Sequence, residues 1–183
     1  MAKIVTMGEI MLRLSTPGNE KFIQADEFDI NYGGSEANVA VSLANYGYDT
    51  EYVSAIPDNP IGDCAVAALR KYNVGTKFIS RSGERLGIYY LEPGSSVRPS
   101  NIVYDRAGSS IACATPDLFD FDAIFADADW FHFTGITPAL SDRAAALTEA
   151  ALKAARAHGV TVSVDLNFRK KLWSQEKARE IMT

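Results

Sequence analysis

The sequence predicts an α/β protein with a doubly wound, mainly parallel sheet and a second, smaller sheet. Short apolar runs typical of buried strands alternate with amphipathic helical segments, which is the pattern of a parallel sheet covered by helices on both faces. Four extended segments, within about residues 10–30 and 87–106, do not fit this alternation, so we expect them to form the second sheet. With 183 residues, 47% of them hydrophobic, the chain can bury the core of one domain or of part of a larger one.

In the first half of the chain, each element is predicted from a local pattern. Residues 3–9 form an apolar run closed by glycine, as in a buried strand that ends near a site. Aromatic, β-branched and acidic residues mix over 22–30, as in a partly exposed strand. Residues 50–56 predict the next strand. Asp63 is the expected N-cap of a helix over 64–72, whose apolar residues recur at helical spacing.

The second half of the chain begins with extended segments and then returns to alternation. Its expected strands are 77–80, 87–92, 102–106, 129–134 and 160–166. Pro116 lies in the first turn of a short expected helix. Asp142 is the expected cap of an alanine-rich helix that Gly159 ends, and a further helix is expected from Ser174.

The stretch 31–47 combines two adjacent glycines with a helix of small and apolar residues. Glycine is required where a group approaches the main chain closely or where φ is positive, so Gly33 and Gly34 predict a tight entry into the helix. The free N–H groups of a helix start can face a ligand. An ordinary loop before a helix would have the same composition. Asn38 is expected to fix the turn rather than to touch a ligand.

Two further groups of polar residues are candidates for a ligand site. Tyr104 and Arg106 are two residues apart and share a face if their segment is a strand, and Tyr90 lies on the neighbouring segment. These side chains fit either a solvated sheet surface or a lid over an anionic ligand. Asn167 and Arg169 follow a buried strand, at the end where open α/β sheets bind ligands, although a surface loop would have a similar composition.

Composition excludes several classes of function. The net charge is −5 and the basic residues are scattered, which argues against nucleic-acid and membrane-surface partners. Cys64 and Cys113 are expected to be buried, reduced thiols, and His132 and His158 have no metal-ligand spacing, so no metal site is expected. No transmembrane or signal segment is recognisable, and a cytoplasmic protein is expected. Walker-type and GxGxxG nucleotide motifs are absent from the sequence.

Several motifs together carry a family resemblance. They are Gly8-Glu9, Gly33-Gly34-x-x-x-Asn38, Asp58 with Gly62, and Asp165-x-Asn167-x-Arg169. With this set, residues 3–183 resemble the amino-terminal portion of the ribokinase-like carbohydrate kinases, the PfkB family. Within it the chain is most similar to kinases of 2-keto-3-deoxygluconate, through Met11-Leu12-Arg13-Leu14-Ser15, Tyr104-x-Arg106 and the segment 165–173. Fructokinase-like relatives typically carry an aspartate where Arg13 stands.

The resemblance implies a ribokinase-like fold in which the four unmatched segments form an antiparallel lid. It also implies a sugar-acid site, because a net-acidic protein needs local arginines to bind a carboxylate. The implied substrate-binding residues are Gly33, Gly34, Tyr90, Tyr104, Arg106, Ile136 and Arg169. Asn167 and Arg169 are the implied cofactor-binding residues. The lid strands are expected to mediate homo-oligomer formation, as in many relatives.

The resemblance further implies transfer of the ATP γ-phosphate, with Mg²⁺, to the sugar acid. The catalytic aspartate, the anion-hole glycines and the magnesium motif of this family lie in a carboxyl-terminal half that has no counterpart in this sequence. We therefore expect the sheet to be truncated at its carboxyl-terminal side and the 183-residue chain to be inactive alone. The alternatives are another sugar kinase of the fructokinase type, a non-catalytic sugar-acid binding module, and an unrelated flavodoxin-like domain.

Overall fold

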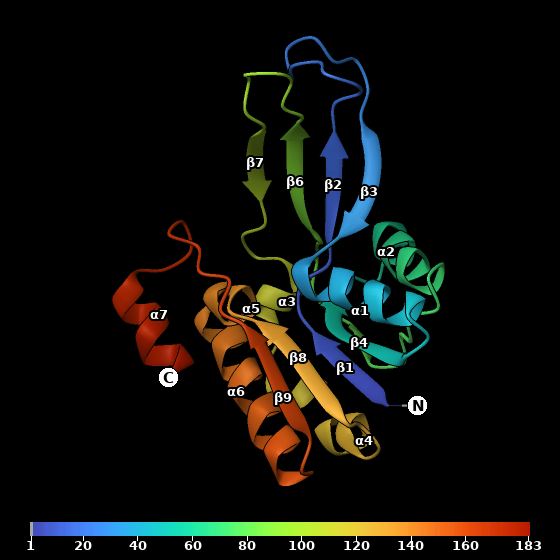
Figure 1. The fold of residues 1–183 in the computed structure, drawn as a ribbon, viewed down its shortest axis with the longest axis vertical. Coiled ribbons are helices and arrows are strands. Elements are labelled where there is room, and N and C mark those ends of the chain that lie inside the picture. Colours follow the sequence, from blue (N-terminus) through green and yellow to red (C-terminus); the bar gives the residue numbers. More distant parts are fainter. Residues whose placement is uncertain (1) are drawn as a thin grey trace.

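The main sheet consists of five parallel strands in the order β5-β4-β1-β8-β9 (Figure 1). The structure, a computed structural model, describes residues 2–183. The strands span Ile79–Arg81 (β5), Asp49–Ile56 (β4), Lys3–Met7 (β1), Trp130–Thr134 (β8) and Thr161–Asp165 (β9). All four neighbouring pairs are parallel, which confirms the predicted mainly parallel sheet.

Helices cover both faces of this sheet, as the alternation of the sequence predicts. The helices are α1 (Ser35–Asn45), α2 (Pro60–Arg70), α3 (Ser110–Cys113), η1 (Pro116–Leu118), α4 (Phe121–Phe125), α5 (Ile136–Ala139), α6 (Asp142–Ala157) and α7 (Gln175–Met182). Strand β4 shows the division of the core, because Val53 packs in a cluster with α4 and α6 while its neighbour Tyr52 packs in a cluster with α1 and α2. No helix among residues 2–183 has the length and apolarity needed to cross a membrane.

A separate four-stranded sheet, which we call the lid, extends from one end of the main sheet (Figure 1). Its strands, in order across the sheet, are β3 (Asp29–Gly33), β2 (Met11–Ser15), β6 (Gly87–Glu92) and β7 (Asn101–Asp105). The two outer pairs are antiparallel, but the central pair β2 and β6 is parallel. The lid is therefore a mixed sheet rather than an antiparallel one, because β2 and β6 both leave the main sheet in the same direction.

Local expectations differ from the structure at several positions. Helix α2 begins three residues before Asp63, because Asn59 is its N-cap and accepts a hydrogen bond from the Gly62 amide at 3.0 Å. Ser141, one residue before Asp142, caps α6 in the same way. Both cysteines are exposed thiols, so the expectation that Cys64 and Cys113 are buried was wrong.

Candidate functional site

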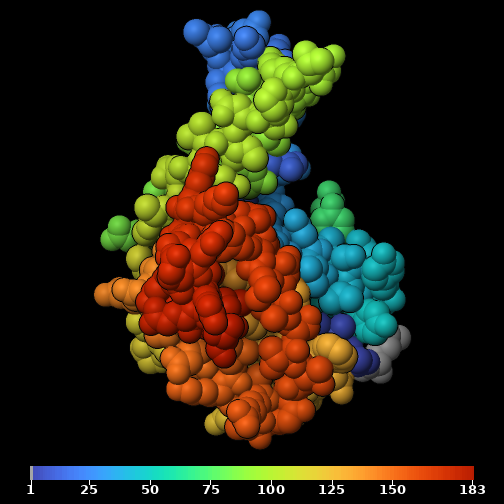
Figure 2. Space-filling view, turned by 60° about the vertical axis from the view of Figure 1, so that its left-hand side comes forward, coloured from blue at the N-terminus to red at the C-terminus, as the bar shows by residue number. Residues whose placement is uncertain are grey.

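A pocket of about 820 Å³ lies between the lid and the carboxyl ends of the main-sheet strands. Glu9 follows β1, Ile136 follows β8 and Arg169 follows β9, so three parallel strands deliver residues to the same edge. Figure 2 shows the segment after β9, in red, rising to the yellow-green lid segment. The residues that line the pocket are Glu9, Met11, Gly33, Gly34, Ser35, Glu36, Asn38, Tyr89, Ser100, Asn101, Ile102, Tyr104, Arg106, Ile136, Arg169, Lys170, Lys171 and Leu172.

The paired glycines line the pocket where β3 passes into α1, and close approach explains Gly34. Its φ is −170°, which any residue can adopt, so a left-handed turn is not the reason for glycine here. A Cβ atom at Gly34 would lie 1.9 Å from the carbonyl oxygen of Glu9. At Gly33 a Cβ would meet Asn38 Oδ1 at 3.2 Å. Gly34 therefore lets the end of β3 pass directly over the loop that follows β1, while Gly33 leaves room for the Asn38 side chain of α1.

The lid contributes a wall of two tyrosines, Tyr89 and Tyr104. They are paired across β6 and β7, and their ring centroids lie 5.8 Å apart. Tyr90 was predicted here, but it is not among the lining residues and packs edge-on against Phe28 at 6.0 Å. The reason is strand alternation, since Tyr104 is paired with Tyr89 and the next residue of β6 points to the opposite face.

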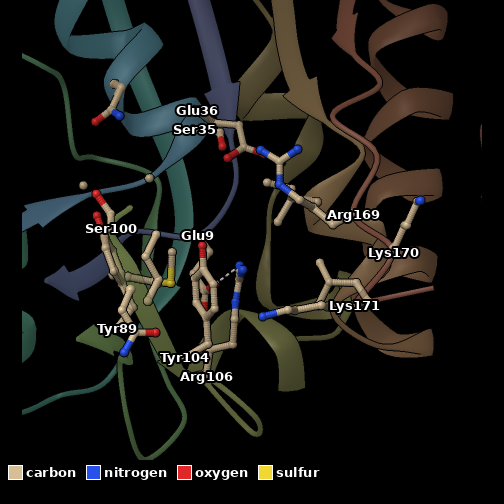
Figure 3. A pocket seen from close by; sticks show the side chains of 18 residues that line it. Glu9, Ser35, Glu36, Tyr89, Ser100, Tyr104, Arg106, Arg169, Lys170 and Lys171 are labelled. Carbon is tan, nitrogen blue, oxygen red and sulfur yellow. Dashed lines mark hydrogen bonds and ion pairs between the residues drawn. The ribbon is translucent and has the colours of Figure 1, made fainter. Parts of the chain in front are cut away.

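Arg106 leaves β7 beside a buried carboxylate. Its guanidinium lies over the Tyr104 ring, 5.7 Å from the centroid, and its Nη2 donates to Glu9 Oε2 (Figure 3). Ser109 Oγ donates to the other oxygen, Glu9 Oε1, at 2.6 Å. Burial raises the pKa of Glu9, whereas the charge of Arg106 and the hydrogen bond of Ser109 lower it. Glu9 belongs to the Gly8-Glu9 motif but was not among the predicted site residues, although its position directly after the first strand is a signal for a site.

The segment after β9 brings three cations to the opposite side of the pocket. Arg169, Lys170 and Lys171 all line it and are all exposed. In Figure 3 the Arg169 guanidinium points toward the start of α1, where Ser35 and Glu36 lie. Asn167 does not line the pocket, because its φ is +42° and its Nδ2 donates to Ser35 Oγ at 3.3 Å. That amide therefore connects the segment to α1.

A second buried carboxylate, Glu36, connects α1 to the end of β8. Its Oε1 accepts hydrogen bonds from the Thr134 amide at 3.1 Å, from Thr134 Oγ1 at 2.8 Å and from Thr137 Oγ1 at 2.8 Å. Burial raises the pKa of Glu36, and these hydrogen bonds oppose that shift. Ile136, predicted in the pocket, lines it, and its amide donates to Thr134 Oγ1 at 3.2 Å. This hydrogen-bond network was not predicted, although Glu36 lies in the glycine-containing stretch 31–47.

The described residues do not include an assembled metal site. No group of three or more His, Cys, Asp or Glu side chains within residues 2–183 could hold a metal ion. The two carboxylates of the pocket are already engaged, Glu9 by Arg106 and Ser109, and Glu36 by two threonines. These residues therefore do not fit a magnesium ion.

Comparison with known proteins finds several kinases of sugar acids that are similar to this chain. The chain is 39% identical over 179 residues, 98% of its length, to 2-dehydro-3-deoxygalactonokinase of Haloferax volcanii, and covers 56% of that protein. It is 30% identical to 2-dehydro-3-deoxygluconokinase of Thermoproteus tenax, over 94% of this chain and 52% of that protein. The crystal structure of 2-dehydro-3-deoxygluconokinase from Thermotoga maritima superimposes with a TM-score of 0.97 at 52% identity, over 100% of this chain and 56% of the other.

A more distant structure, an uncharacterized sugar kinase from Pyrococcus horikoshii in complex with ATP, shares the fold at 21% identity and a TM-score of 0.84, over 98% of this chain and 58% of that one. The chain spans about half the length of the curated relatives it matches. The pfkB family carbohydrate kinase profile matches residues 1–183. The chain therefore belongs to the pfkB family of carbohydrate kinases.

Proposed function

We propose that residues 1–183 form the sugar-acid binding part of a kinase that transfers the ATP γ-phosphate to 2-keto-3-deoxygluconate, also called 2-dehydro-3-deoxygluconate. The observation that carries the proposal is the charge of the pocket. Three cations of the segment after β9, Arg169, Lys170 and Lys171, line the same pocket as Arg106. In a protein of net charge −5, this concentration of positive charge favours an anionic ligand.

The remaining lining groups suit the sugar portion of such a ligand. Gly33 and Gly34 line the pocket and present main-chain atoms rather than side chains to a ligand. Tyr89 and Tyr104 offer aromatic faces and hydroxyls on the lid side. The guanidinium of Arg169 can donate two parallel hydrogen bonds to a carboxylate, which a lysine cannot do.

The epimeric acid 2-keto-3-deoxygalactonate is the second candidate, because the relative from Haloferax volcanii is a 2-dehydro-3-deoxygalactonokinase. The two acids differ at one hydroxyl-bearing carbon, and the carboxylate is common to both. A titration with each acid distinguishes the two substrates without altering the proposed role of the cations.

The experiment that tests the proposal is isothermal titration of the chain and of Arg169→Ala with 2-keto-3-deoxygluconate. We expect the variant to lose about 1.5–3 kcal/mol of binding free energy, which is roughly a 10- to 150-fold weaker Kd. Arg156→Ala, which removes an exposed arginine from the last turn of α6, is the matched control and should bind as the parent does. Equal affinities of the Arg169→Ala variant and the parent would contradict the assignment of the carboxylate.

We also propose that ATP and Mg²⁺ serve the whole kinase and that this chain alone does not catalyse the transfer. Phosphoryl transfer requires a group that orients the acceptor hydroxyl and cations that neutralise the phosphates. The chain covers about half of its relatives' length, and both pocket carboxylates already have partners. ATP-dependent phosphorylation of the sugar acid by the purified chain would refute this second proposal and leave the binding proposal intact.

A further inference from the structure

We propose that Glu9, supported by Ser109, is a positioning residue that sets the orientation of the Arg106 guanidinium toward the acid end of the ligand. The inference rests on the proposed function, since it concerns how the same pocket recognises a sugar acid. Neither Glu9 nor Ser109 needs to touch the ligand for this role.

The carboxylate of Glu9 joins three segments that are distant in sequence. Glu9 lies in the loop between β1 and β2, Arg106 follows the last residue of β7, and Ser109 is the N-cap residue of α3. Glu9 accepts from Arg106 through Oε2 and from Ser109 through Oε1 at 2.6 Å, so each oxygen has a different partner. Only 3% of the Glu9 side chain and 13% of the Arg106 side chain are exposed, which restricts both to this arrangement.

The lid leaves space for the Glu9 carboxylate at Gly87. A Cβ atom at Gly87, the first residue of β6, would lie 2.5 Å from Glu9 Oε1 and 3.2 Å from Arg106 Cβ. Any larger residue at position 87 would displace the pair. The absence of a side chain there is an observation independent of the ion pair, and it indicates that this strand leaves room for the Glu9 carboxylate.

The contacts of Arg106 leave part of its guanidinium for a ligand. One face is turned to the Tyr104 ring, and Nη2 is committed to Glu9. Within residues 2–183, Nη1 makes no hydrogen bond, and Arg106 lines the pocket. Glu9 also offsets the charge of Arg106. The contribution of Arg106 to ligand binding therefore depends more on the direction of its N–H groups than on its positive charge. The cations after β9 supply the uncompensated charge.

A double-mutant cycle tests this role, with isothermal titration of 2-keto-3-deoxygluconate into the 183-residue chain. Glu9→Ala should weaken binding about tenfold while Arg106 is present, and should add no loss when Arg106→Ala is also present. Glu9→Gln, which keeps an acceptor for Arg106, should remain within about threefold of the parent. A loss from Glu9→Ala that is the same in both backgrounds would overturn the proposal, as would parent-like binding by Glu9→Ala.

Two further measurements keep the test decisive if Glu9→Ala fails to fold or if binding by Arg106→Ala is too weak to titrate. Ser109→Ala should weaken binding less than Arg106→Ala does, and parent-like binding would argue against the supporting role of Ser109. In ¹⁵N NMR spectra, the Arg106 guanidinium should show restricted rotation in the parent and in Glu9→Gln. Free rotation of this group in the parent would overturn the proposal.

The control is Glu51→Ala, which removes a partly buried glutamate that also packs against a glycine, Gly75, but lies outside the pocket. It should bind the sugar acid as the parent does. If the parent itself does not bind the acid, the proposed function fails together with this inference. If the parent binds and Arg169→Ala weakens binding while Glu9→Ala does not, the inference about Glu9 fails alone.

Discussion

Single residues determine how closely the lid and the main sheet approach each other. Gly34 is the clearest case, because its neighbour across the gap is the Glu9 carbonyl, a main-chain atom that cannot move aside as a side chain can. Gly33 has a flexible neighbour, the Asn38 side chain, and at a larger distance. The two adjacent glycines therefore differ in how much they constrain the structure.

The first prediction compares Gly34→Ala with Gly33→Ala. A Cβ atom at position 34 must displace the β1–β2 loop, so we expect a loss of about 1–3 kcal/mol of stability, at roughly 2–4 °C of Tm per kcal/mol. Gly33→Ala should change Tm much less, because Asn38 can rotate. Thermal unfolding followed by circular dichroism measures both. Equal Tm values for the two variants would mean that the close approach at Gly34 is relieved without cost.

The second prediction compares the two neighbouring tyrosines of β6. Tyr89→Ala should weaken sugar-acid binding by about 1 kcal/mol or more, since this tyrosine lines the pocket. Tyr90→Ala should leave affinity unchanged and lower only stability, because it loses the contact with Phe28. Titration of the acid into each variant gives the comparison. Weaker binding by Tyr90→Ala but not by Tyr89→Ala would instead support Tyr90 as the substrate-binding tyrosine.

The placement of a residue in the pocket could be predicted where the family resemblance named it, and not where the placement depends on tertiary contacts. Gly33, Gly34, Tyr104, Arg106, Ile136 and Arg169 are all pocket residues. The choice between Tyr89 and Tyr90 requires the register of β6 against β7, which the sequence alone does not supply. Glu9 acquires its partners from residues about 100 positions away, so no local pattern could reveal them.

At the scale of elements, Glu36 holds the start of α1 against the end of β8. Three hydrogen bonds converge on one carboxylate oxygen, and a Cβ atom at Gly8 would lie 2.2 Å from the Glu36 Cδ. The Gly8 carbonyl in turn accepts from Tyr52 and Ser54, at 2.8 and 2.7 Å. This buried network holds the start of α1, which lines the pocket, against β4 and against the residues that follow β1 and β8.

The third prediction concerns the pH dependence of stability. Burial raises the pKa of Glu36 in the folded state above its ordinary value of 4.5. At pH values between 4.5 and the raised pKa, the folded state therefore binds more protons than the unfolded state. Stability therefore falls as pH rises through this window, by up to about 1.4 kcal/mol per pH unit for one group. Glu36→Gln keeps an acceptor for the threonines and removes the titration, so its stability should decline less from pH 5 to pH 7.

Urea unfolding at the two pH values measures this difference. Glu9 and Glu51 have pKa values raised in the same direction, so part of the decline should persist in the variant. Glu149→Gln, an exposed residue paired with Lys153 on α6, is the control and should decline as the parent does. An unchanged slope in Glu36→Gln would show that Glu36 has the same pKa in both states.

The elements of the main sheet were predictable because their apolar periodicity is strong, whereas the lid was predictable only in outline. The expected strand over 22–30 begins later, at Asp29, because Thr16, Glu20 and Glu92 hold a turn-rich segment before it. The parallel pairing of β2 with β6 joins segments separated by about 70 residues. Self-association through the lid strands stays a prediction, which analytical ultracentrifugation of the purified chain would test.

At the scale of the whole molecule, the position of the pocket follows from the topology. Parallel strands place the residues that follow β1, β8 and β9 at one edge, and the lid strands continue upward from that edge (Figure 1). Cations from the segment after β9 line the same pocket as Tyr104 and Arg106. A pocket built between two sheets in this way can select a ligand by charge on one side and by shape on the other.

The most direct test of sugar-acid recognition is a comparison of an acid with a neutral sugar in the same pocket. Isothermal titration of the 183-residue chain should show binding of 2-keto-3-deoxygluconate at least about tenfold tighter than binding of fructose, because the acid gains charge-assisted hydrogen bonds. The preference should diminish at high salt, since the cations after β9 are exposed. Fructose binding as tightly as the acid, or a preference that salt leaves unchanged, would contradict the account.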